Sequence, residues 1–326
     1  MIVTRAPLRI SFAGGGTDIP WYYEREGGAV VGSAINKYVW MCVNKKFDRR
    51  VRVSYSKTEN VSATADLKHE LAKACLRAYG IHRGIEIVSI ADVPGEGTGL
   101  GSSSAYIVGL LLALAAYKGD DFPPPNDLAE SAAEIELGVL KRPIGKQDHY
   151  FAAHGGLLRI DFWRSGTVRA RALNMSTDAI NDLEDSLLLL YTGLCRPAHS
   201  ILTRMRVAAI EKERPWHMLK QIKGLADEVT TSMEAGDIDE LGVLMYEDWI
   251  RKKQLATGIT NAVIEEKIKA AIEAGAQGGK LLGAGGGGFL LVQANPKKHD
   301  HIVGKTKLRR MTVRLNAPGA EVIFCE

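Results

Sequence analysis

A glycine-rich segment at residues 94–105 constrains this chain more than any other feature. It reads P-G-E-G-T-G-L-G-S-S-S-A, follows a strand predicted over residues 85–90, and runs directly into an apolar helix over residues 103–117. Glycines adopt positive φ, so successive N–H groups can point into one concavity. The helix behind adds unpaired N–H groups and the positive end of its dipole. The segment therefore predicts a phosphate-binding loop, whose contacts we expect from Gly97, Thr98, Gly99, Leu100, Gly101, Ser102, Ser103 and Ser104.

Two common phosphate motifs do not describe this segment. A Walker loop needs G-K-[ST], and neither lysine nor threonine follows Gly101. A Rossmann fingerprint needs glycines directly after the strand and an acid that ends the next strand, but Asp120 and Asp121 lie in a proline-rich turn. A glycine-rich linker before a core helix stays open as the alternative, although linkers rarely end in a serine-capped buried helix.

The glycine excess is concentrated in short segments. The chain has 34 glycines, whereas average usage gives about 23 for this length. A block at residues 14–16 follows Arg9 and precedes Thr17 and Asp18, and an ordinary β-turn with surface charges would explain it equally well. A further block within residues 280–289 contains four consecutive glycines, which carry a large ordering cost unless something must approach the backbone.

Numbered in chain order, the first glycine block is residues 14–16, the second is residues 94–105 and the third lies within residues 280–289. Two acids lie between the second and third blocks. A helix predicted from Asn126 places Glu136 in the middle of its apolar arc, where a carboxylate is costly unless a cation or metal pairs with it. A buried salt bridge to arginine or lysine is the alternative. Twelve residues later, Asp148 lies in the turn G-K-Q-D, where an exposed ion pair with Lys146 is the ordinary explanation.

Composition excludes several classes of protein. The 326 residues are 46% apolar and 25% charged, as in globular proteins and unlike collagen or disordered chains. The four cysteines lack C-x-x-C spacing, and the longest apolar run, residues 105–116, is too short to span a bilayer. We therefore expect a cytoplasmic protein with no membrane partner. The basic stretch at residues 297–314 has no interleaved aromatic residues, so we expect a solvated helix face and no nucleic-acid partner.

Together the three glycine blocks resemble those of the small-molecule kinases named for galactokinase, homoserine kinase, mevalonate kinase and phosphomevalonate kinase (GHMP). That family carries A-P-x-[RK] with a later T-D, then P-x-x-x-G-L-G-S-S before a helix, then a glycine-rich C-terminal loop, and all three occur here in order. The resemblance implies an α+β, two-domain architecture. Residues 1–170 would form an N-terminal domain like domain 2 of ribosomal protein S5, and residues 171–326 a ferredoxin-like C-terminal domain.

The resemblance also implies roles for individual residues. Asp148 matches the proposed catalytic base, and Arg9 the basic residue near the transferred phosphate of ATP. Ser103 and Glu136 match the pair that holds Mg²⁺. The acceptor site would comprise Gly15, Gly16, Thr17, Asp18, Gly285 and Gly286.

The acceptor implied by the resemblance is a sugar phosphate. Galactokinases have Glu-His before T-D, where this chain has Gly15 and Gly16, and R-I-S-F-A-G-G-G-T-D and G-K-Q-D-H-Y look most like bacterial D-glycero-D-manno-heptose 7-phosphate kinases. Phosphorylation of the anomeric hydroxyl would then give the 1,7-bisphosphate for GDP-heptose and surface polysaccharide. Arg196 is the expected clamp on the acceptor's phosphate, with Lys146 and Arg142 as alternatives. A fucokinase- or galactokinase-like enzyme and a non-catalytic sensor stay open, as does a homodimer.

Overall fold

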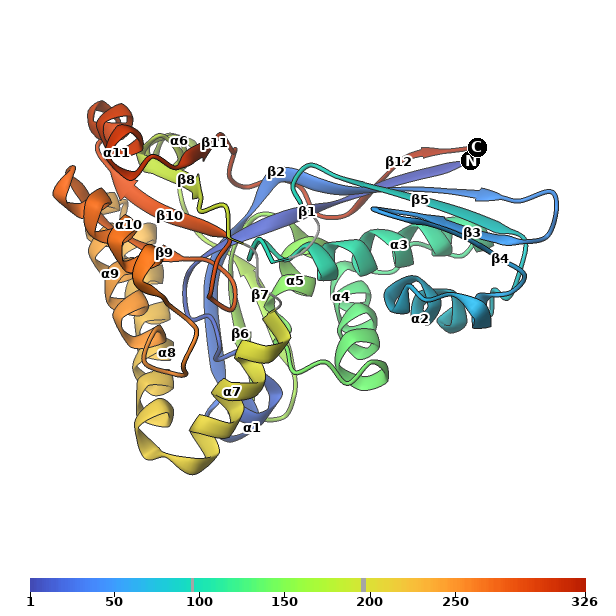
Figure 1. Cartoon of the computed structure of the whole chain (residues 1–326), viewed down its shortest axis with the longest axis horizontal. Coiled ribbons are helices and arrows are strands. Elements are labelled where there is room, and N and C mark those ends of the chain that lie inside the picture. The colour runs from blue at the N-terminus through green and yellow to red at the C-terminus, as the bar shows by residue number, and fades with distance from the viewer. Residues whose placement is uncertain (95–96, 195–197) are drawn as a thin grey trace.

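The computed structural model describes residues 1–94, 97–194 and 198–326, and it contains two sheets with helices packed against them (Figure 1). The larger sheet has eight strands, six of them in the order β12-β1-β2-β5-β3-β4. Of the other two, β6 pairs with β2 and β7 pairs with β6. The smaller sheet has four strands in the order β11-β8-β10-β9. No helix of the described part of the chain is long and apolar enough to cross a membrane.

The larger sheet is built mainly from the N-terminal half of the chain. Its strands are β1 (Ile2–Ala13), β2 (Gly28–Lys45), β3 (Val51–Ser54), β4 (Thr58–Val61), β5 (Ile85–Ala91), β6 (Leu157–Phe162), β7 (Val168–Ala172) and β12 (Glu321–Cys325). The first of them, β1, runs without a break from Ile2 to Ala13, through Pro7. The register with β2 shifts between Pro7 and Leu8, and such an irregularity tolerates a residue without an N–H donor.

Helices cover one face of this sheet (Figure 1). The central one is α3 (Ser102–Lys118), whose residues from Ser104 to Ala115 are all buried because it is apolar around its whole circumference. Around it lie α2 (Glu70–Ala78), α4 (Pro125–Ala133) and α5 (Gln147–His154), and a π-helical turn (Glu134–Val139) extends α4. A short helix, α1 (Pro20–Glu26), links β1 to β2.

The smaller sheet belongs to the C-terminal half. Its strands are β8 (Leu187–Tyr191), β9 (Ala276–Leu281), β10 (Phe289–Ala294) and β11 (Arg309–Met311). The helices of this half are α6 (Thr177–Ser186), α7 (Ala198–Glu211), α8 (Glu213–Ala235), α9 (Ile238–Lys252), α10 (Ala262–Glu273) and α11 (His299–Thr306). The long helices α8 and α9 lie side by side (Figure 1). Helix α8 packs against β1 and β2, whereas α9 packs against β1 and against β9 and β10 of the small sheet.

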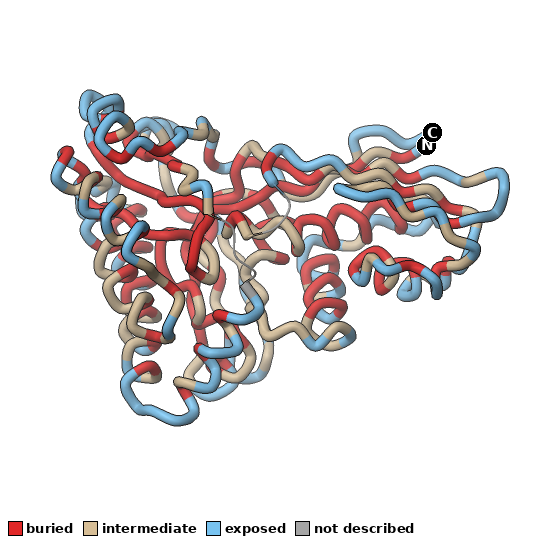
Figure 2. Tube along the Cα trace, viewed as in Figure 1, coloured by how far each residue is buried: buried red, intermediate tan, exposed pale blue. Residues whose placement is uncertain are grey.

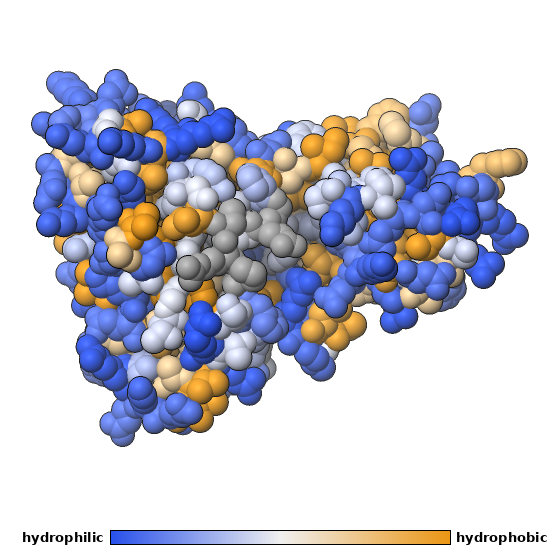
Figure 3. All heavy atoms as spheres, viewed as in Figure 1, coloured by the Kyte–Doolittle hydropathy of each residue, from blue (hydrophilic) through white to orange (hydrophobic). Residues whose placement is uncertain are grey.

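The buried apolar residues form two clusters, and the larger of them joins the two halves of the chain. The larger buried cluster joins residues of β1, β2 and α3 to Leu225 and Val229 of α8 and to Leu291 of β10. Figure 2 shows this core as a continuous buried stretch through the strands and α3, with exposed residues at the periphery. Residue 170, the expected domain boundary, lies within β7, and the last strand, β12, pairs with β1 of the N-terminal sheet although it lies in the range 171–326. Figure 3 shows a broad part and a narrower part of the molecule, with hydrophilic residues over most of this face.

Candidate active site

The second glycine block forms a loop between β5 and the start of α3. Gly97, Gly99 and Gly101 have φ values of 71°, 78° and 82°, a region that residues with a Cβ rarely adopt. Gly101 is the N-cap of α3 and supplies no side-chain cap, so the first N–H groups of the helix stay available to a ligand. The hydroxyl of Ser102 is buried and has no hydrogen-bond partner among the described residues. The loop therefore has the geometry of an anion cradle.

The third glycine block closes directly on this loop. A Cβ added to Gly283 would lie 2.4 Å from Cα of Gly99, and one added to Gly99 would lie 2.6 Å from the carbonyl oxygen of Leu282. The backbone N–H of Phe289 donates to the carbonyl oxygen of Thr98 at 3.2 Å. Because two backbones meet here without side chains between them, the glycines at residues 99 and 283 are required by packing.

Arg9, on β1 just before the first glycine block, also contacts the phosphate loop. Its backbone N–H donates to the carbonyl oxygen of Leu100 at 3.1 Å, and its guanidinium donates to the carbonyl oxygen of Gly99. Its Nε donates to Oδ1 of Asp148 at 2.7 Å. Asp148 lies in the first turn of α5, and its Cγ would be 3.3 Å from a Cβ at Gly101. The exposed pair considered between Asp148 and Lys146 does not form, because Lys146 pairs with Glu130 at 2.7 Å.

Asp18 is a second carboxylate beside Asp148. Its oxygens accept hydrogen bonds from the backbone N–H groups of Gly16 at 3.0 Å and Gln147 at 3.1 Å. A Cβ at Gly145 would lie 1.9 Å from Oδ2 of Asp18, which explains the glycine of the G-K-Q-D turn. Burial raises the pKa of Asp18, the charge of Asp148 raises it further, and the two N–H groups oppose this shift. Thr17 is buried and fixes the turn through hydrogen bonds to the carbonyl oxygens of Gly14 and Ala29.

Glu136 lies on the π-helical turn and is fully buried. Its carboxylate accepts hydrogen bonds from Ser104 and Arg142, each at 2.9 Å, and lies 2.9 Å from Nε2 of His149. Burial alone would raise the pKa of Glu136, but the hydrogen bond and charge of His149, then Ser104 and Arg142, outweigh it and hold this pKa at about 2. The buried salt bridge considered for Glu136 is therefore present, with Arg142 as the cation. π-Helical turns often occur at functional sites.

The expected metal pair is only partly assembled, because the serine that contacts Glu136 is Ser104 and not Ser103. The described residues contain no cluster of three or more histidines, cysteines and acids. Mg²⁺ in phosphate sites usually takes one or two protein ligands and completes its shell with phosphate and water oxygens. The serine hydroxyls at the start of α3, among them the unpartnered Ser102, and the ionised Glu136 are hard oxygen ligands of this kind.

The remaining acceptor residues fall into three groups. Gly15 is buried beside Gln147, and Gly16 faces Leu219 and Met205 of the helices α8 and α7. Gly285 and Gly286 pack against Ile259, whose carbonyl oxygen accepts the N–H of Gly286 at 2.8 Å. A Cβ at Gly285 would lie 2.6 Å from the carbonyl oxygen of Ile259, so packing requires that glycine, whereas a Cβ at Gly15 or Gly16 would make only ordinary contacts. The contact of these glycines with the acceptor stays a prediction. Arg196 lies outside the described residues.

Three buried charged residues of the C-terminal half were not predicted. Lys280 of β9 pairs with Asp248 of α9 at 2.5 Å, and both side chains are fully buried. The ammonium of Lys280 also donates to the carbonyl oxygen of Phe12, and Asp248 accepts the N–H of Gly14, so this pair anchors the first glycine block. Lys252, at the end of α9, is 6% exposed and donates to the carbonyl oxygen of Gly283 at 2.6 Å. A sequence signal for their burial was available. One face of the helix carries Leu241, Met245, Asp248 and Lys252, so the two charged residues share the spacing of the buried apolar ones.

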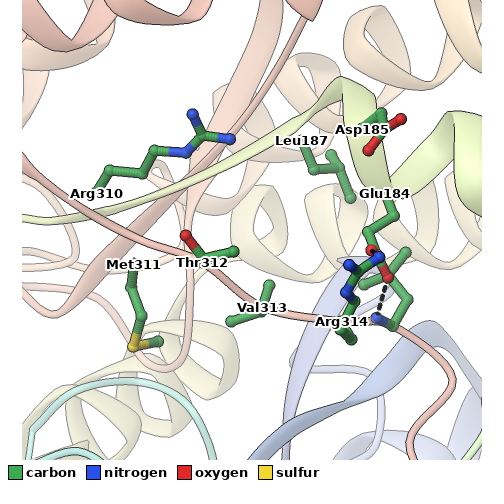
Figure 4. Close-up of a pocket in the computed structure, with 9 residues that line it drawn as sticks. Glu184, Asp185, Leu187, Arg310, Met311, Thr312, Val313 and Arg314 are labelled. Carbon is green, nitrogen blue, oxygen red and sulfur yellow. Dashed lines mark hydrogen bonds and ion pairs between the residues drawn. The ribbon is translucent and has the colours of Figure 1, made fainter.

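Two hollows lie away from this site. One of about 120 Å³ is lined by Glu184, Arg310 and Arg314 among others, and Figure 4 shows the ion pair of Arg314 with Glu184 at its edge. The other, of about 560 Å³, lies between α2 and the π-helical turn. Neither is lined by the glycine blocks, Arg9, Asp18 or Asp148.

Comparison with known proteins decides the family. The profile of the GHMP kinases N-terminal domain matches residues 66–156, and that of the GHMP kinases C-terminal domain matches residues 229–303, together about half of the chain. The chain belongs to the GHMP kinase family. It is therefore an ATP-dependent kinase with the two-domain GHMP fold, as expected from its three glycine blocks.

Several relatives of this GHMP kinase are known. The D-glycero-alpha-D-manno-heptose 7-phosphate kinase of Campylobacter jejuni is 28% identical over 93% of this chain and 92% of its own length. The L-fucokinase/L-fucose-1-P guanylyltransferase of Bacteroides fragilis is 29% identical over 99% of this chain but only 37% of its own length. A solved D-glycero-D-manno-heptose 1-phosphate kinase from Bacteroides thetaiotaomicron covers all of both chains, with a TM-score of 0.81 and 25% identity.

Proposed function

We propose that this GHMP kinase transfers the γ-phosphoryl group of ATP to the anomeric hydroxyl of D-glycero-D-manno-heptose 7-phosphate and so forms the 1,7-bisphosphate. The observation that carries the proposal is the meeting of Arg9, Asp148 and Asp18 beside the phosphate loop. Similarity to heptose phosphate kinases over nearly the whole chain supports the coarser function, an ATP-dependent sugar kinase. The product would supply GDP-heptose for surface polysaccharide.

Each residue of the site has its own role in the proposed phosphoryl transfer. The N–H groups of residues 97–104 hold the phosphates of ATP, and Asp18 orients the sugar through its hydroxyls. Asp148 accepts the proton of the anomeric hydroxyl while that oxygen bonds to the γ-phosphorus and the bond to the β,γ-bridging oxygen breaks. Arg9 stabilises the charge on the transferred group. Mg²⁺, held by Ser103 and Glu136, would neutralise charge on the β- and γ-phosphates.

A screen of acceptors tests this proposal. The purified protein is incubated with ATP and Mg²⁺ and with heptose 7-phosphate, fucose, galactose or mevalonate, and ADP is measured. We expect ADP with heptose 7-phosphate and, by ³¹P NMR, a new phosphate ester on the anomeric carbon. Phosphorylation at another carbon would overturn the proposed reaction, and no ADP with any acceptor would favour a sensor.

Fucose is the second candidate acceptor. It is favoured by the Bacteroides fragilis relative, which is 29% identical over 99% of this chain and 37% of its own length. Fucose carries no phosphate, so the two candidates differ in charge as well as in shape. A kcat/KM higher for fucose than for heptose 7-phosphate would select this second candidate.

A further inference from the structure

Lys252 places a buried ammonium group where the first and third glycine blocks meet. Its Nζ donates to the carbonyl oxygen of Gly283 at 2.6 Å. The same Nζ lies 3.7 Å from the position that a Cβ would take at Gly15, and Nε2 of Gln147 lies 3.8 Å from that position. Gly15 and Gln147 flank Asp18, so Lys252 faces the acceptor half of the site.

This ammonium has no counter-ion of its own. Among the described residues, no carboxylate lies within ion-pair distance of Lys252, whereas Lys280 pairs with Asp248 and Lys253 pairs with Glu265. The pKa of Lys252 is lowered to about 8, mainly by burial and then by the charge of Lys280, with a smaller contribution from Arg9. The charges of Asp248 and Asp18 raise this pKa but do not outweigh the lowering. A buried cation without a partner is costly, and an anion placed beside it would remove that cost.

The other cations of the site already have partners. Arg9 pairs with Asp148, Lys146 with Glu130, and Arg142 with both Glu136 and Glu70. Lys252 uses one of its three N–H donors on Gly283 and has no other hydrogen bond to the described residues. On the acceptor side the ammonium faces Gly15, which has no side chain and where a Cβ would lie 3.7 Å from Nζ.

We propose that Lys252 binds a phosphoryl group in the acceptor half of the site. The group is either the acceptor's own phosphate or the γ-phosphoryl group in transfer, and the chemistry of recognition is the same for both. This proposal rests on the proposed kinase function but not on the identity of the sugar.

A direct measurement of Lys252 tests phosphate binding without any acceptor. Protein with ¹³C- and ¹⁵N-labelled lysine is titrated with pH in the presence and absence of inorganic phosphate, and Lys252→Arg assigns the Lys252 signal. We expect the pKa of Lys252 to rise by about one unit or more when phosphate is bound, because the anion stabilises the charged form. An unchanged titration at saturating phosphate would overturn the proposal, even if heptose 7-phosphate proved not to be the acceptor.

Steady-state kinetics then separate the two sources of the phosphoryl group. Lys252→Met is compared with Lys253→Met, which removes the same charge one residue away from a lysine paired with Glu265. If the acceptor's phosphate is bound, KM rises about tenfold to a hundredfold for the phosphorylated sugar and little for the unphosphorylated one. If the γ-phosphoryl group is bound, kcat falls by a similar factor for both. Unchanged kinetics with both sugars would contradict the proposal.

Gly15→Glu provides an independent variant that leaves the lysine in place. The new carboxylate would reach the ammonium and neutralise it, so we expect the same kinetic loss as for Lys252→Met. Gly15→Gln is the matched comparison, because it adds a side chain of nearly the same size without the charge. A loss for Gly15→Glu well beyond that for Gly15→Gln is then due to the carboxylate. Full activity of Gly15→Glu in a folded protein would overturn the assignment.

Discussion

Asp148 is held at one carboxylate oxygen by Arg9, and among the described residues its Oδ2 has no partner. The free oxygen is available to accept a proton from a bound hydroxyl. We expect Asp148→Asn to lower kcat by about a hundredfold to ten-thousandfold, since an amide cannot serve as the base. ATP binding, measured by calorimetry, should change little because the phosphate loop is untouched.

Asp161→Asn is the matched control for this substitution. Asp161 forms an ion pair with Arg159 and has nearly the same side-chain exposure as Asp148, 24% against 25%, but it lies on β6. It should retain full activity. Equal activity of Asp148→Asn and Asp161→Asn would remove Asp148 from the mechanism.

Glu136 makes stability depend on pH. Its pKa is about 2 in the folded protein against an ordinary value of 4.5. A lowered carboxyl pKa contributes stability above the ordinary value, and this contribution is lost as the pH falls through the folded value. In the absence of ligands, Glu136→Gln should therefore unfold more easily at pH 7, by about 3 kcal/mol. Urea titrations from pH 7 downward should show the difference shrinking below about pH 4.5, whereas a constant difference would contradict this account.

At the scale of elements, the contact of the phosphate loop with the third glycine block admits no side chain. Gly283→Ala places a methyl group against the backbone of Gly99, so the two loops must separate. Gly119→Ala is the control, because Gly119 has a similar φ of 74° but nothing within 4 Å. Both should lose about 1–2 kcal/mol of stability from the positive φ. Only Gly283→Ala should also raise the KM for ATP, and a normal KM would show that the loops are not coupled.

The elements also show where sequence reasoning succeeds. The strand, glycine loop and buried helix of residues 85–118 were predictable because local propensity and tertiary packing agree there. The burial of Glu136 was predictable from the apolar arc of its helix. Its partners were not, because the π-helical turn changes the angular spacing and His149 comes from the next helix.

At the scale of the molecule, the buried pair of Lys280 and Asp248 joins the two halves. Removing one partner leaves an uncompensated charge, so Asp248→Asn and Lys280→Met should each cost about 3–5 kcal/mol. The double variant should cost clearly less than the sum of the two, because neither charge is then stranded. Urea unfolding of the four proteins measures the coupling, and additivity of the single effects would disprove it.

These long-range pairings also mark the limit of prediction from sequence. Lys280 meets the carbonyl oxygen of Phe12 and Asp248 meets the N–H of Gly14, across more than 230 residues. No local pattern encodes such contacts, and the same holds for the return of β12 to β1. The three glycine blocks were visible because each requires a special backbone, whereas Lys252 looked like an ordinary lysine at a helix end.

The pairing of β12 with β1 determines when the large sheet can be completed during synthesis. Val3 lies opposite Phe324, and the N-terminal ammonium donates to the carbonyl oxygen of Glu326. Residues 2–91, which form most of this sheet, are synthesised long before residues 321–325, so the sheet cannot gain this edge strand until those residues have also emerged. Until then β1 presents an unpaired edge to other nascent chains. The N-terminal sheet of this kinase thus depends on β12 to cover the edge of β1 and so to prevent aggregation through it.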